Sequence, residues 1–279
     1  MVYFCHRLKY KYCATVGFSL ESANVVGYQD KELNGGANTF VVQTFLPCGV
    51  VAKDVTLSAF IPKDGADGWD YYTDFLATLK VNGNIQKKYG YLSSYWAGEY
   101  WNEEDAGWYD FSVLEEDPEV IEAEKADATK IPFGTGFLVY TSKANVNVKF
   151  SGEVLKGDIA LPLNGGANTF VGNVTPNAIK LNELLATSGA NGWDYYTDFL
   201  ATLKTNGNLL HKYGYLSPYW ASEYWSEEDS GWYDFSVLEA DPETIEADKV
   251  SDEVVFKSGE GFLIYTSKAN VELLVPGAL

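Results

Sequence analysis

The sequence predicts a mostly β protein of two tandem, homologous domains, each β-sandwich or barrel-like with one or two short helices. Three observations support this prediction: a repeat that spans most of the chain, short β-branched and aromatic runs, and glycine-rich turns between those runs. The chain has 279 residues, which is enough for two domains of ordinary size.

The repeat is visible by direct comparison of the two parts of the chain. The octapeptide LNGGANTF occurs at Leu33–Phe40 and again at Leu163–Phe170. The segment Trp69–Pro118 matches Trp193–Pro242 at 41 of 50 positions. This similarity indicates a duplication of one domain.

The landmarks divide the chain into three parts. Residues 1–22 form an N-terminal extension, residues 23–152 the first β-rich repeat domain, and residues 153–279 the second. We call the two domains the first copy and the second copy. Each has an ordinary single-domain length, so each is expected to fold on its own.

Strands are predicted from residue type and from the turns between them. The runs DFLATLK and LLHKYGYL of the second copy flank Asn206-Gly207, and Asn82-Gly83 occupies the equivalent place in the first copy. Asn-Gly favours a two-residue hairpin with a type I′ turn, because both central residues of that turn need a positive φ. Further strands are predicted at Phe137–Thr141, Val146–Phe150, Phe262–Thr266 and Val271–Val275.

Two short helices are predicted outside the matched strands. At Ile179–Ala186 the side chains of Leu181, Leu184 and Leu185 would share one helical face. The acidic stretch Asp117–Ala128 begins with Asp-Pro-Glu, which is typical of a helix start.

The extension at 1–22 differs in charge from the rest of the chain. Three basic residues against Glu21 give it a charge of +2, whereas the whole chain carries 20 − 39 = −19. A basic start followed by ATVGFSL resembles a secretory signal, and an ordinary N-terminal strand is the alternative. Of the three cysteines only Cys48 lies in a repeat, so no disulfide framework or metal site is expected.

The overall composition excludes several classes of protein. A net charge of −19 repels phosphate backbones, so nucleic acid is not an expected partner. The sequence has no run of about 18 apolar residues, so a membrane-spanning helix is not expected. The chain holds only two histidines, and His211 is replaced by Lys87 in the first copy. No catalytic histidine common to both copies is therefore predicted.

Aromatic residues supply the candidate binding site. The segments SSYWAGEYWNEEDAGWYD and SPYWASEYWSEEDSGWYD place six aromatic side chains in a short span of each copy. Trp and Tyr rings stack on the apolar faces of sugars, and neighbouring carboxylates accept hydrogen bonds from sugar hydroxyls. The candidate ligand-binding residues are Tyr95, Trp96, Glu99, Tyr100, Trp101 and Trp108 in the first copy, and Tyr219, Trp220, Glu223, Tyr224, Trp225 and Trp232 in the second.

The same rings have a structural interpretation. Trp and Tyr usually pack in a core, and here they could also fill the contact between the copies. The acidic run Glu103–Asp105 favours exposure of this segment. Trp96 and Tyr100 lie four residues apart, so a partly exposed amphipathic loop or short helix is expected.

Carboxylates raise two further possibilities. A glycosidase needs two facing carboxylates, and Glu99, Glu103, Glu104 and Asp110 could supply them, although 39 acidic residues make neighbouring acids common by chance. The segment at 64–70, DGADGWD, resembles a Ca²⁺ loop, but its equivalent at 188–194, SGANGWD, loses two of three charges. We therefore expect a turn there, with no catalytic residues, metal or cofactor in either copy.

Three short motifs stand out in the combined pattern: a Gly-Asn-x-x-Pro turn at Gly172, Asn173 and Pro176, then Gly-Trp-Tyr-Asp, and Gly-x-Gly-Phe. Together they resemble a group of uncharacterised secreted bacterial tandem β-repeat proteins. The first copy departs from it, because Val41-Val42-Gln43-Thr44 replaces the Gly-Asn turn. The resemblance implies an extracellular location and a β architecture, and it implies no chemistry.

These observations lead to one expected function and two alternatives. We expect a non-catalytic, secreted or cell-surface bacterial protein that binds glycan or another surface ligand through its aromatic segments, with two copies raising avidity. The first alternative is a structural protein whose partners are its own copies in a filament, coat or scaffold. The second is a carboxylate-based glycosidase.

Overall fold

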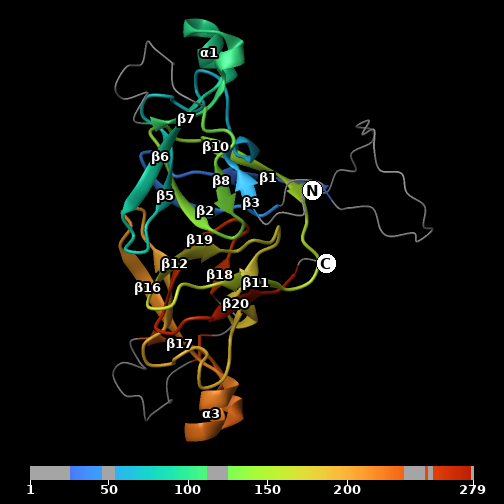
Figure 1. Ribbon diagram of the computed structural model, residues 1–279, viewed down its shortest axis with the longest axis vertical. Helices are drawn as coiled ribbons and strands as arrows, with labels where there is room; N and C mark the ends of the chain where they lie inside the picture. Colours follow the sequence, from blue (N-terminus) through green and yellow to red (C-terminus); the bar gives the residue numbers. More distant parts are fainter. Residues whose placement is uncertain (1–25, 46–53, 112–124, 236–248, 251–253, 278–279) are drawn as a thin grey trace, which may run out of the picture.

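The computed structural model describes residues 26–45, 54–111, 125–235, 249–250 and 254–277 (Figure 1). Within these ranges the protein is mostly β, with two short α-helices, and its sheets fall into two repeating halves. The extension at 1–22 and most of the helix predicted at Asp117–Ala128 lie outside them. No helix in the described part is long and apolar enough to cross a membrane.

Each copy contains one five-stranded antiparallel sheet with the same strand order. In the first copy the order is β2-β9-β5-β6-β7, with bounds Ala37–Val42, Gly136–Thr141, Phe75–Leu79, Ile85–Leu92 and Gly107–Asp110. In the second copy it is β12-β19-β15-β16-β17, with bounds Ala167–Gly172, Gly261–Thr266, Phe199–Leu203, Leu209–Leu216 and Gly231–Asp234. The helices α1 (Ser94–Tyr100) and α3 (Pro218–Tyr224) each follow the fourth strand of the sheet.

Smaller sheets complete each copy. The three-stranded sheets are β1-β10-β4, with bounds Val26–Glu32, Asn147–Glu153 and Ile61–Pro62, and β11-β20-β14, with bounds Ile159–Pro162, Glu272–Val275 and Leu185–Ala186. The two-stranded sheets are β3-β8, at Asp54–Thr56 and Lys130–Pro132, and β13-β18, at Ile179–Lys180 and Val255–Phe256. Short 3₁₀ helices lie at Leu57–Ala59, Glu103–Asp105, Leu181–Glu183 and Glu227–Asp229.

The five-stranded and three-stranded sheets of the two copies are arranged as a four-bladed, propeller-like ring. The four strands predicted outside the hairpins are confirmed as β9, β10, β19 and β20. Corresponding strands also pair in the same register. For example, Tyr91 lies opposite Trp108 in the first copy, and Tyr215 lies opposite Trp232 in the second.

The hairpins predicted at the two Asn-Gly pairs are confirmed, but the prediction of a type I′ turn is wrong. Gly83 and Gly207 have φ values of 83° and 84°, whereas neither preceding asparagine has a positive φ. The amide of Gly83 donates to the carbonyl of Lys80 at 2.8 Å, and the amide of Lys80 donates to the carbonyl of Asn84 at 2.8 Å. This pattern fits a longer loop in which only the glycine adopts the left-handed conformation, as in a turn followed by a glycine bulge.

The helix predicted at Ile179–Ala186 is also wrong. The segment forms β13, a single 3₁₀ turn and β14. Leu181 and Leu184 are fully buried, while Leu185 is exposed. The flanking backbone pairs with β18 and β20, so interstrand hydrogen bonds replace those of a helix.

Each copy has its own hydrophobic cluster, centred on a pair of tryptophans. Trp69 and Trp108 meet edge to face with ring centroids 5.6 Å apart, and the equivalent pair Trp193 and Trp232 lies at 5.4 Å. All four indole rings are buried. Large aromatic side chains contribute strongly to core energetics, so these pairs anchor the two cores.

The two copies also pack closely against each other. Strands β2 and β9 of the first copy lie against β12 and β19 of the second (Figure 1). A Cβ atom on Gly136 would lie 3.1 Å from the carbonyl carbon of Phe170, and one on Gly261 would lie 3.1 Å from that of Phe40. Glycine therefore permits this close approach of the backbones. Val42 of the first copy belongs to the hydrophobic cluster of the second.

Candidate functional site

The candidate site of each copy is built around its short helix. Helices α1 and α3 lie at opposite ends of the molecule (Figure 1). Ser93 adopts an extended conformation before α1, and its hydroxyl accepts a hydrogen bond from the amide of Trp96 at 3.5 Å. Pro218 occupies the first turn of α3, where its missing N–H costs no helical hydrogen bond. The residues before and at the start of α1 and α3 therefore favour the beginning of a helix in both copies.

Aromatic side chains gather around each helix. We name these groups the aromatic tips. The first consists of Tyr71, Tyr72, Tyr95, Trp96, Tyr100 and Trp101, and the second of Tyr195, Tyr196, Tyr219, Trp220, Tyr224 and Trp225. Tyr71 is buried at the centre of the first tip, 5.8 Å from Trp96 and 5.2 Å from Trp101 between ring centroids.

Part of each tip faces solvent. Tyr100 and Tyr224 are each 61% exposed. Tyr72 and Tyr95 are exposed as well, whereas Trp96 is half-buried. The rings of Trp96 and Tyr100 are stacked at 5.8 Å with an interplanar angle of 18°. The sequence predicted a partly exposed amphipathic loop or short helix, and the structure has the short helix, with these two residues on one face.

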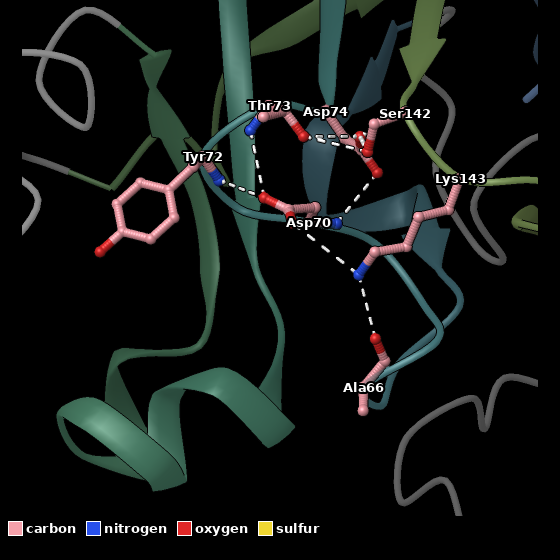
Figure 2. A network of polar contacts seen from close by, with 7 residues as sticks. All are labelled: Ala66, Asp70, Tyr72, Thr73, Asp74, Ser142 and Lys143. Atoms are coloured by element: carbon pink, nitrogen blue, oxygen red, sulfur yellow. Dashed lines mark hydrogen bonds and ion pairs between the residues drawn. The ribbon is translucent and has the colours of Figure 1, made fainter. Parts of the chain in front are cut away.

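A network of polar contacts fixes the turn at residues 70–74, before β5 and next to the first tip (Figure 2). The carboxylate of Asp70 accepts hydrogen bonds from the amides of Tyr72 at 3.0 Å and Thr73 at 3.2 Å. The buried carboxylate of Asp74 accepts from both the amide and the hydroxyl of Ser142 at 2.7 Å. Figure 2 shows the ring of Tyr72 pointing away from this network.

A lysine lies beside each tip. The Lys143 ammonium group is 3.8 Å from the carboxylate of Asp70, and it donates to the carbonyl of Ala66 at 3.0 Å (Figure 2). It also lies 5.9 Å from the ring centroid of Trp96. In the second tip Lys268 lies 5.6 Å from the Trp220 ring centroid. Each lysine therefore links the polar network to the aromatic rings.

Burial changes the acidity of the central tyrosines. Desolvation raises the pKa of Tyr71 and of Tyr195 well above 10, and the hydrogen bond of each to the following tyrosine adds to this effect. Desolvation and the nearby Asp105 raise the pKa of Tyr109 to about 12. These phenols stay neutral at physiological pH, so they act as hydrogen-bonding and packing groups.

Two of the predicted ligand-binding residues, Trp108 and Trp232, do not lie at a tip. Trp108 and Trp232 are each only 1% exposed, and their indole N–H groups donate to the carbonyls of Phe60 at 3.0 Å and Leu184 at 2.8 Å. These two tryptophans lie in the core and are not accessible to a ligand.

The other predicted residues surround the helices. Glu99 and Glu223 are exposed on α1 and α3. Tyr71, Tyr72 and Lys143 were missed because they precede or follow the aromatic segment by many positions. The repeated Trp-Asp-Tyr-Tyr motif was the available signal for the two tyrosines.

The acidic candidates occupy ordinary structural positions. Glu103 and Glu104 are exposed in a 3₁₀ turn. Asp64 lies in the expected turn, where its carboxylate accepts from the amides of Gly65 at 2.7 Å and Tyr95 at 3.1 Å. Ser188 accepts from the amide of Tyr219 at 3.4 Å in the second copy. A side-chain oxygen at this position therefore accepts a hydrogen bond from the start of the helix in both copies. The oxygen belongs to a charged group in Asp64 and to a neutral group in Ser188.

The described residues hold no group of three or more His, Cys, Asp or Glu side chains placed to bind a metal ion. Comparison of the chain with protein-family models, with curated proteins and with solved structures gave no match.

Proposed function

We propose that the protein is a non-catalytic, exported or surface-associated bacterial protein that binds glycans through its two aromatic tips. The observation behind the proposal is the repeated geometry of these tips. Each copy presents exposed tyrosines beside a half-buried tryptophan, over a rigid polar network. Because the two sites are built in the same way, we expect both to bind the same class of ligand.

The chemistry of the tips suits a sugar ring. Trp96 and Tyr100 offer apolar faces, and stacking on such a face contributes about 1 kcal/mol per contact. The phenol groups of the exposed tyrosines donate and accept hydrogen bonds, and the carboxylate of Glu99 accepts them. A sugar presents the complementary combination of C–H faces and hydroxyl groups.

The charge of the protein favours neutral glycans. The chain carries a net charge of −19, and Glu99, Glu103 and Glu104 are exposed on or next to the helix of the first tip. These carboxylates repel sulfated and uronate-rich chains at moderate ionic strength. We therefore assign neutral oligosaccharides and polysaccharides as the ligands of the tips.

The position of the tips determines how two sites would work together. They lie at opposite ends of the molecule, so one short oligosaccharide cannot contact both (Figure 1). A glycan-bearing surface or a long polysaccharide can engage the two tips on separate chains. The proposed action is thus bridging between glycan chains, with avidity where the chains are dense.

The experiment compares tip variants on an array of neutral and acidic glycans and on beads coated with the neutral glycans that bind. The variants are Tyr100→Ala, Tyr224→Ala and the double variant. We expect each single variant to keep binding but to stop agglutinating the beads, because one tip remains. We expect the double variant to lose array binding at least about tenfold, the effect of removing about 1.4 kcal/mol.

The matched control is Tyr28→Ala, which removes an exposed tyrosine of β1, away from both tips. It should bind and agglutinate like the unaltered protein. Binding of the double variant at the original level would reject the tips as the glycan site. Absence of binding to any neutral glycan by the unaltered protein would reject the proposed function itself.

Self-association is the second candidate function, and the opposed tips favour it. A protein with two nearly identical adhesive ends polymerises end to end if each end binds its equivalent. The exposed face of Tyr100 and Tyr224 would then be buried between molecules. Sedimentation velocity separates the candidates: concentration-dependent polymers that Tyr100→Ala reduces to dimers support a filament, and a monomer at all concentrations contradicts it.

A further inference from the structure

A polar cleft of about 500 Å³ lies between the two copies, away from the aromatic tips. The first copy lines it with β1 and with the residues around the start of β2. The second copy contributes the turn before β19 and the end of the β15–β16 hairpin. Its central residues are Gln29, Lys31, Lys257, Ser258 and Glu260.

The two copies meet a second time, on the other side of their interface, through the residues equivalent to those of the cleft. These equivalent residues are apolar. Alignment of the two copies places Leu161 at the position of Lys31, and Phe133 at that of Ser258. Leu161 is buried, and Phe133 packs against both hydrophobic clusters. Pro132 likewise corresponds to Lys257. The same contact between copies is thus apolar on one side and polar, with an open cleft, on the other.

The ammonium group of Lys31 is weakly satisfied in the cleft. Its hydrogen bond to the carbonyl of Ser258 is long at 3.4 Å. No carboxylate of the described residues lies within 4.0 Å of it. Desolvation lowers the pKa of Lys31, Glu260 opposes this effect and Lys257 adds to it. A half-buried amine with these neighbours is stabilised by an anion that enters the cleft.

The neutral polar residues of the cleft are suited to a hydroxylated ligand. Asn34, Asn38 and Thr205 supply amide and hydroxyl groups at the cleft, and Phe40 is half-buried there. Gln29 and Ser258 are already joined, since the Ser258 hydroxyl lies 2.7 Å from the Gln29 side-chain oxygen. The lining also holds the carboxylates of Asp30, Glu32 and Glu260 and the ammonium groups of Lys204 and Lys257. The walls therefore offer hydrogen bonds to hydroxyl groups beside the charge of Lys31.

We propose that the cleft between the copies is a second binding site, which takes a small sugar acid with its carboxylate on Lys31 and Lys257 and its hydroxyl groups on the surrounding amides. The site is distinct from the aromatic tips and does not depend on their function. Because both copies line the cleft, neither copy forms this site alone.

The test measures the melting temperature of the full chain with D-glucuronate or D-galacturonate, against glucose and sodium sulfate at matched ionic strength. We expect the two uronates to raise the melting temperature and glucose to leave it unchanged. Lys31→Leu, which installs the side chain of the other copy, should abolish the response to uronates. It should also raise the melting temperature without ligand, because leucine removes a half-buried charge.

The control Lys149→Leu removes the same charge from an exposed site on the adjacent strand β10, and it should respond to uronates as the unaltered protein does. If Lys31→Leu fails to fold, Lys31→Met keeps an unbranched side chain of nearly the same length and tests the same charge. No response of the unaltered protein to either uronate, an equal response to sulfate, or an unchanged response of the Lys31 variant would each overturn the proposal.

Discussion

The aromatic tips and the face where the copies meet have diverged to different extents. The tips lie in a segment with 41 identities in 50 positions, and their ring distances agree closely: Tyr71 to Trp96 is 5.8 Å, and Tyr195 to Trp220 is 5.7 Å. At the meeting face, Lys31 and Ser258 stand where Leu161 and Phe133 stand on the other side. One region was thus duplicated with its geometry intact, while the other became asymmetric.

The difference follows from what each region contacts. A tip packs only against its own copy, so an identical sequence reproduces it. The meeting face packs one copy against the other, so a side chain has to fit its partner rather than its own equivalent. Lys31 meets Ser258, and Leu161 lies beside Gly134, next to Phe133. The interface is therefore a match between two different surfaces.

The largest expected effect comes from separating the copies. Expressed individually, residues 23–152 and residues 153–279 should each fold, because each has its own sheets and core. A homodimer of the first copy would place Lys31 against Phe133, burying an amine without a partner. We therefore expect the mixed copies to form a one-to-one heterodimer at least about tenfold tighter than either homodimer.

Sedimentation velocity of each copy and of their mixture measures this preference. The reference is the full chain, in which the two copies are covalently joined. Homodimers as tight as the heterodimer would show that the asymmetric residues do not determine pairing. A copy that lacks a cooperative melting transition on its own would show that the two copies form a single folding unit.

The next effect compares core and tip within each copy. Trp108→Ala and Trp232→Ala should each lower the free energy of unfolding by about 3–5 kcal/mol, because each leaves a cavity and removes a buried hydrogen bond. Tyr100→Ala and Tyr224→Ala should change it by less than about 1 kcal/mol, since both rings are largely exposed. Denaturant unfolding measures all four changes. If a tip variant lost as much free energy of unfolding as a core variant, its ring would belong to the core.

The smallest effect concerns the two hairpin glycines. Gly83→Val and Gly207→Val should each cost about 1–2 kcal/mol, because a β-branched residue is strained at φ near 84°. The two costs should agree, since a new Cβ meets only Phe170 at 3.7 Å at Gly83 and open space at Gly207. Thermal unfolding measures both, and no change in either copy would mean that the loop relaxes without a left-handed residue.

Much of the fold could be predicted because its signals are local. The hairpin strands and β9, β10, β19 and β20 follow from β-branched and aromatic runs between glycine turns. The turn type and the segment Ile179–Ala186 could not be predicted in the same way. A helical face and a strand–turn–strand can both bury Leu181 and Leu184, and the pairing partners β18 and β20 lie far along the chain.

The candidate site shows the same division. The sequence predicted an aromatic loop or short helix, since Trp96 and Tyr100 are four residues apart. It grouped Trp108 with them, although pairing of β7 with β6 turns that ring into the core beside Trp69. It missed Tyr71 and Lys143, which reach the tip from strand ends distant in sequence.

The sequence by itself determined the duplication, the β class, the hairpins and the aromatic character of the tips, because each depends on neighbouring residues or on direct comparison of the copies. Tertiary structure decided which rings are exposed, that the tips lie at opposite ends, and that a cleft opens on one side of the meeting face. These features depend on contacts between residues such as Lys31 and Ser258, which are 227 positions apart. No local pattern encodes a contact over such a distance, since packing and backbone pairing across the whole chain determine it.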